Sequence, residues 1–195
     1  MHETKWREKA TEWMKQRWPD DIFIEEAYVP YGAGSIHDKY ARPDILRISE
    51  DGDISVVELK KWGSPEFSKW AILGQIQFYT FLIETQHKQD SDHHWMSNLR
   101  KKGLESCAAL EAIERKIEGK EELVIDWCVV IVGGEKCEIE QSETLWHMHD
   151  YVNFWLDDNQ WFRPMFLIHL NEDEGGFSCS NLECWFREGE LEEET

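Results

Sequence analysis

Two carboxylates and one ammonium group lie at the ends of two short apolar segments of the chain. Asp44 opens the segment DILRI, and the segment DISVVELK ends in Glu58, Leu59 and Lys60. Burying an unpaired charge is costly, so these ends either lie at the surface or their charges meet a partner. Two carboxylates held side by side repel each other, and a bound divalent cation would offset that repulsion.

The turn between the two segments decides whether these charges meet. Side chains alternate along a strand, so Glu58 and Lys60 share one face. A two-residue turn would place Asp44 opposite Leu59, on the other face. A three-residue loop ending in Gly52 places Asp44 opposite Glu58, and its third position favours a glycine in the left-handed conformation. The sequence EDG fits this loop, which gathers the three charges at one end of a hairpin.

The rest of the chain predicts the elements that hold this hairpin. The run LVIDWCVVIVGG is typical of a strand buried on both faces, and Pro164 restricts the last predicted strand to an edge or a bulge. The order of elements predicts an α/β (α+β) fold with a central mixed sheet flanked by helices. The first helix has an apolar stripe formed by Trp6, Ala10, Trp13 and Met14. Helices are expected at residues 3–18, 66–86, 95–118 and 143–156, and strands at residues 21–29, 44–48, 53–60, 123–134 and 161–170.

Two short motifs in this arrangement are similar to those of a known family. Pro43-Asp44, followed after thirteen residues by ELK, resembles the signature of the PD-(D/E)XK nuclease superfamily. The segment QIQFY supplies Gln75 and Tyr79, and it looks like the QxxxY motif of the RecB-like branch. The order helix, strand, strand, strand, helix, strand also matches the restriction-endonuclease-like core of that family.

The resemblance implies a Mg²⁺-dependent nuclease that hydrolyses phosphodiester bonds in DNA, in repair, recombination, phage replication or defence. Asp44, Glu58 and the backbone carbonyl of Leu59 would bind the Mg²⁺, or Mn²⁺ in its place. Lys60 would position or help to deprotonate the attacking water and stabilise developing negative charge.

The same resemblance assigns residues around the metal. Gln75 is expected to act beside the metal site, and Tyr79 to contact the substrate, with packing on the sheet as an alternative role for Tyr79. Arg42 and Lys61 are further candidates for contact with the substrate. Other basic residues that could contact phosphate are Lys69, Arg100, Lys101 and Lys102.

Many members of this family add an acidic ligand from the first helix. Glu3 lies in line with the predicted apolar stripe, whereas Glu8 and Glu12 fall on the opposite face at 100° per residue. Periodicity therefore favours Glu3 as a further metal ligand. Glu25 and Glu26, in the first predicted strand, remain alternatives.

The length of 195 residues predicts a single domain. Its nuclease-like core is expected at about residues 3–134, followed by C-terminal additions at 135–187 and an acidic tail at 188–195. No apolar run approaches a membrane span, and the amino terminus lacks the apolar stretch of a signal peptide. Five cysteines, an odd number, fit a reducing compartment. A cytoplasmic protein without membrane contact is expected.

The formal net charge of −19 argues against a broad nucleic-acid surface, because binding to phosphates needs a positive face. A basic partner protein, a homodimer or a larger complex could provide affinity for DNA. The acidic tail could instead occupy the groove and restrain activity. In the alternative function, the chain is a catalytically silent nuclease-fold protein that acts as an acidic interaction module or DNA mimic.

Overall fold

The structure is a computed structural model. It describes residues 3–27, 29–30, 40–68, 71–89, 108–119, 121, 123–148, 152, 166–173 and 176–181. Its centre is a six-stranded mixed sheet in the order β1-β4-β5-β6-β7-β8. These strands are β1 (Ile22–Glu25), β4 (Ile45–Ile48), β5 (Ile54–Lys61), β6 (Ile125–Val132), β7 (Phe166–Asp173) and β8 (Gly176–Asn181). Two short strands, β2 (Val29–Pro30) and β3 (Tyr40–Ala41), pair separately with each other.

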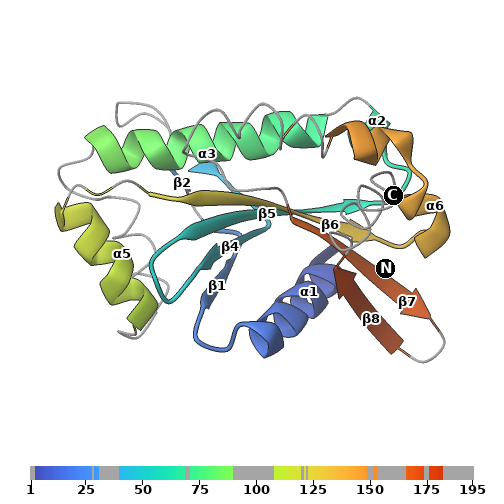
Figure 1. Ribbon diagram of the computed structural model, residues 1–195, viewed down its shortest axis with the longest axis horizontal. Helices are drawn as coiled ribbons and strands as arrows, with labels where there is room; N and C mark the ends of the chain where they lie inside the picture. The colour runs from blue at the N-terminus through green and yellow to red at the C-terminus, as the bar shows by residue number, and fades with distance from the viewer. Residues whose placement is uncertain are drawn as a thin grey trace, which may run out of the picture.

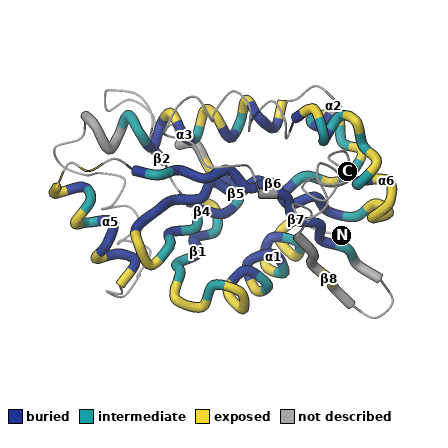
Figure 2. The backbone as a smooth tube through the Cα atoms, viewed as in Figure 1, coloured by how far each residue is buried: buried dark blue, intermediate teal, exposed yellow. Residues whose placement is uncertain are grey.

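Helices cover both faces of the sheet (Figure 1). The first core cluster joins α3 and α5 to the face that carries Leu46 and Val56. The second joins α1 to the face that carries Ile45 and Val57. Figure 2 shows the central strands as the most continuously buried part of the chain. The helices are α1 (Glu3–Arg17), α2 (Pro65–Ser68), α3 (Ala71–Gln89), α5 (Ala108–Gly119) and α6 (Lys136–Glu140), and residues 143–148 are also helical.

The predicted mixed sheet flanked by helices is therefore confirmed. Strands β1, β4 and β5 form an antiparallel meander, and β6 then pairs parallel to β5. All eight residues of β6 are buried, as its apolar sequence predicts. None of the helices in the described part of the chain is long and apolar enough to cross a membrane.

The turn between β4 and β5 has the predicted three-residue loop. Ile48 is paired with Ile54, and the Ser49 amide donates to the Asp53 carbonyl at 2.8 Å. Gly52 has a φ of +78°, the left-handed conformation that favours glycine. A Cβ atom at this position would lie 2.8 Å from the backbone nitrogen of Ile113 in α5. Gly52 is therefore needed both for the turn and for the close approach of α5.

The buried stripe of α1 differs from the predicted one. Ala10 and Met14 are buried as expected, but the other buried positions are Arg7 and Thr11. The predicted stripe members Trp6 and Trp13 are only partly buried at the margin of the second cluster. The helix is rotated toward β1 because Arg7 forms ion pairs with acidic residues at the end of that strand.

The strand predicted at 21–29 ends at Glu25, because Glu26 adopts a φ of +46° and turns the chain. The helix predicted at 66–86 is described as α2 and α3, and residues 69–70 between them lie outside the described residues. The helix predicted at 95–118 is described only from residue 108, where α5 begins, and residues 95–107 lie outside the described residues.

The predicted edge placement of the last strand is wrong. β7 lies between β6 and β8, so its described residues are not at an edge of the sheet, and the other predicted placement, a bulge, concerns Pro164. Pro164 itself lies outside the described residues. The sheet edge is instead β8, which no pattern in the sequence indicated and which pairs antiparallel to β7.

Candidate active site

The ends of β4 and β5 bring the two predicted carboxylates together. Ile45 is paired with Val57, so the preceding Asp44 lies opposite the following Glu58. The Leu59 amide donates to Asp44 Oδ2 at 2.8 Å, and the Asp44 amide lies 3.4 Å from Glu58 Oε1 as a longer contact. These contacts fix both carboxylates relative to the backbone of the hairpin.

Lys60 lies on the same face as Glu58, because side chains alternate along β5. Its Nζ atom is 3.3 Å from Glu58 Oε2. Glu58 is almost completely buried, whereas the side chain of Lys60 is 17% exposed. The site therefore has a buried acidic end and an ammonium group that reaches toward solvent.

Burial and mutual repulsion dominate the electrostatics of the carboxylate pair. Burial, followed by the charge of Asp44, raises the pKa of Glu58 to about 8. Burial also raises the pKa of Asp44, although the Leu59 amide and Lys60 oppose this shift. At neutral pH the pair therefore retains a proton that two solvated carboxylates would have lost.

The helix α3 carries the two residues of the predicted QxxxY motif, and the charges of the carboxylate pair act on one of them, Tyr79. Burial, followed by the charges of Glu58 and Asp44, raises the pKa of Tyr79 to about 12. Tyr79 also packs against the first core cluster. Gln75 lies one turn earlier, and its Oε1 atom is buried without a hydrogen-bond partner among the described residues. Both the packing role and a position at the site are thus observed for Tyr79.

The start of α1 lies near the site as well. The charge of Glu3 contributes to raising the pKa of Asp44, and the charge of Arg7 contributes to lowering it. Glu3 is exposed at the first turn of the helix. Arg7 forms ion pairs with Glu25 and Glu26, the two alternatives to Glu3 as a metal ligand. Its Nε atom is 3.4 Å from Glu25 Oε2, and its Nη1 atom is 3.0 Å from Glu26 Oε1. Arg7 had no role in the sequence prediction.

Of the other predicted substrate contacts, Lys61 and Arg42 lie in the described part of the chain. Lys61 is exposed and, by alternation along β5, points to the α1 side of the sheet, opposite to Lys60. Arg42 is exposed two residues before Asp44. The remaining basic candidates, Lys69, Arg100, Lys101 and Lys102, and the acidic tail at 188–195 lie outside the described residues.

The donor atoms of the site are those that a hard cation prefers. Asp44 and Glu58 contribute carboxylate oxygens, and Leu59 contributes a backbone carbonyl that follows directly on Glu58. In the described part of the chain, no three His, Cys, Asp or Glu side chains form a group able to hold a metal ion. Mg²⁺ commonly takes only one or two protein carboxylates and completes its shell with water and phosphate, so these residues fit it.

His169 on β7 is a polar residue of this face that sequence patterns did not single out. Lys60, Ile131 and His169 are paired in a row across three strands. The backbone of Gly133 and Gly134 hydrogen-bonds to the imidazole, and its Nε2 atom has no partner among the described residues. Burial lowers the pKa of His169, which favours the neutral ring. The sequence could not indicate that His169 belongs to this face, because a single histidine within a predicted apolar strand forms no motif.

No family model, curated protein or solved structure matches the chain. A function therefore has to follow from the arrangement of Asp44, Glu58 and Lys60 and from the chemistry that these side chains permit.

Proposed function

We propose that the protein is a metal-dependent nuclease of the PD-(D/E)XK type, in its RecB-like branch, that hydrolyses phosphodiester bonds in DNA. The observation that supports this most strongly is the opposition of Asp44 and Glu58 on antiparallel strands, with Lys60 on the same face. Packing alone does not require a buried carboxylate, a partly buried one and an ammonium group at one strand end, because replacing such groups with apolar ones often stabilises a fold.

The arrangement of elements is also in keeping with this proposal. In chain order, α1, β1, β4, β5, α3 and β6 repeat the sequence helix, strand, strand, strand, helix, strand, with α2 before α3 and α5 between α3 and β6 as further helices. The short pair β2 and β3 is inserted between β1 and β4. The resemblance of the PD, ELK and QxxxY motifs implies the same order. The element order and the motifs are two different observations, and both support the proposal.

In the proposed reaction each residue has a separate task. Asp44, Glu58 and the Leu59 carbonyl would hold Mg²⁺, which supplies positive charge that polarises the phosphate when it is bound. The Lys60 ammonium would orient the attacking water and stabilise negative charge that develops on the phosphate. Tyr79 and Gln75 would border the substrate from α3.

The net charge of −19 favours a second candidate, because a strongly acidic protein repels DNA at long range. In this alternative the chain is an acidic interaction module or DNA mimic without catalysis. For the nuclease, a basic partner, a homodimer or displacement of residues 188–195 would provide the missing affinity for DNA.

The test is incubation of the purified protein with labelled single-stranded, linear duplex, circular and branched DNA in Mg²⁺, Mn²⁺ or EDTA. The nuclease predicts metal-dependent cutting that falls about 100-fold or more in Lys60→Met. Lys9→Met is the matched control, because Lys9 lies on the exposed face of α1 in an ion pair with Glu12.

Two other outcomes separate the alternatives. The absence of both cutting and calorimetric metal binding would support the interaction module. Metal binding without cutting would support a restrained nuclease, and removal of residues 188–195 or addition of a basic partner should then restore cutting.

A further inference from the structure

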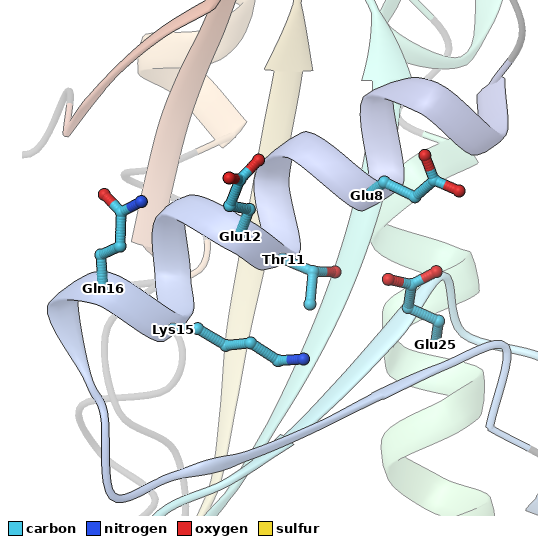
Figure 3. Close-up of a pocket in the computed structure, with 6 residues that line it drawn as sticks. All are labelled: Glu8, Thr11, Glu12, Lys15, Gln16 and Glu25. Carbon is cyan, nitrogen blue, oxygen red and sulfur yellow. The ribbon is translucent and has the colours of Figure 1, made fainter.

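A second polar site lies on the α1 face of the sheet, opposite to the face that carries the carboxylate pair. A pocket of about 380 Å³ opens between α1 and β1, and it falls in the size range of small-ligand sites, about 300–1,000 Å³. It belongs to the helix that covers the opposite face of the sheet from α3. Figure 3 shows the side chains that line it, which are Glu8, Thr11, Glu12, Lys15, Gln16 and Glu25.

The charges of the lining favour a cation. The lining contains three carboxylates and one ammonium group, that of Lys15. Glu12 is already engaged by Lys9 at 2.6 Å, and Glu25 by Arg7 at 3.4 Å. Glu8 has no ion pair within the described part of the chain. Glu8 is therefore the lining carboxylate that no ion pair among the described residues neutralises.

Thr11 provides an independent sign of a ligand. The residue is only 4% exposed, and its Oγ1 atom has no hydrogen-bond partner among the described residues. Leaving a buried hydroxyl unsatisfied costs free energy, so a partner for it is expected. In Figure 3 the Thr11 hydroxyl is directed into the space between α1 and β1, and the Glu25 carboxylate faces the same space from the strand.

We propose that this pocket binds a primary alkylammonium group. An ammonium group has three N–H donors, and the pocket offers three acceptors in the Thr11 hydroxyl and the carboxylates of Glu8 and Glu25. The net charge of −19 raises the local concentration of such a cation. The site lies on the opposite face of the sheet from Asp44 and Glu58, and of the sequence-predicted metal ligands it includes only the alternative Glu25. The nuclease proposal rests on Asp44, Glu58 and Lys60, so either proposal can fail without the other.

A free polyamine or a lysine side chain of a partner protein could supply this group. Isothermal titration calorimetry at constant ionic strength, with spermidine and with Nα-acetyl-lysine amide, measures both sources. The expected result is saturable binding at one site by at least one probe. Binding by the lysine amide as well as by spermidine points to a protein partner, and binding by spermidine alone points to a polyamine.

Three variants locate the binding. Glu8→Gln is expected to weaken it about tenfold, because one charge-assisted hydrogen bond is lost. Glu118→Gln removes the same charge from an exposed position on α5 and should leave the affinity unchanged. Lys15→Met removes a like charge from the pocket and is expected to tighten binding.

Thr11→Val separates binding from a merely structural role. It removes the unsatisfied hydroxyl while keeping a branched side chain, so the melting temperature without ligand should rise while the affinity for the ammonium probe falls. Absence of saturable binding by both probes would overturn the proposal. So would an equal loss of affinity in Glu8→Gln and Glu118→Gln, because the effect would then be one of overall charge.

Discussion

Lys60 Nζ lies 3.3 Å from Glu58 Oε2, yet this ion pair does not keep Glu58 ionised at neutral pH. Burial and the neighbouring Asp44 raise the pKa of Glu58 to about 8, and they outweigh the attraction of the ammonium group. The positive charge of Lys60 is therefore not enough to keep both carboxylates ionised. A cation that enters the site has to displace a proton.

The affinity for Mg²⁺ should consequently rise with pH. Between pH 6 and pH 8 the metal competes with the proton on the pair, so the dissociation constant is expected to fall by up to about tenfold per pH unit. Calorimetry in two buffers with different ionisation enthalpies measures the number of protons released. Glu58→Gln carries no titrating proton, and it should both lose affinity and show no proton release at this site.

The stability of the metal-free protein should change with pH in the opposite sense. The pKa of Glu58 rises from 4.5 to about 8 on folding, so between these values the folded state binds a proton that the unfolded state does not. The free energy of unfolding then falls as pH rises through this window, by at most about 1.4 kcal/mol per pH unit for one proton. Urea titrations at several pH values measure the slope. The difference between wild type and Glu58→Gln isolates this residue, and an identical slope in both would contradict the assignment.

Substitution of Gly52 should be more damaging than its position in a turn suggests, because the residue is buried. Gly52→Ala has to adopt a φ of +78° and also brings a Cβ to 2.8 Å from Ile113 N. A loss of about 1–3 kcal/mol in unfolding free energy is expected from the conformation, with a further loss from the clash. Gly63→Ala is the matched control, because Gly63 has a φ of +76° but nothing within 4 Å of the added Cβ. Chemical denaturation of both variants should show the larger loss for Gly52→Ala.

Removing the charge of Arg7 should destabilise the junction of α1 and β1. Arg7→Met leaves Glu25 and Glu26 without the buried guanidinium that binds both. About 1–2 kcal/mol of unfolding free energy is expected to be lost, since the two carboxylates are partly exposed and can rehydrate. Lys9→Met, which breaks an exposed pair on the same helix, should change stability little. Comparable losses in the two variants would show that the burial of Arg7 is not decisive.

The hairpin that holds the carboxylates could be predicted from the sequence because its rules are local. Strand alternation puts Glu58 and Lys60 on one face, and the position of Gly52 selects the loop that sets the register of Asp44. The helical spacing of Gln75 and Tyr79 similarly placed both on one side of α3.

The orientation of α1 could not be predicted in this way. Periodicity assigned Trp6 and Trp13 to the core, but the burial of Arg7 depends on Glu25 and Glu26, which only the folded chain brings near. The same rotation buries Thr11, whose hydroxyl has no hydrogen-bond partner among the described residues. His169 was missed for a related reason, since its place in the same cross-strand row as Lys60 depends on the pairing of β5, β6 and β7.

The three-residue loop between β4 and β5 has a consequence for the evolution of the chain. Exposed turns ordinarily tolerate insertions and deletions. Here a gain or loss of one residue at Gly52 would shift the pairing by one position and send Asp44 to the α1 side of the sheet, away from Glu58. Related chains that keep both carboxylates should therefore vary the residue types of this loop at Glu50 and Asp51 but preserve its length.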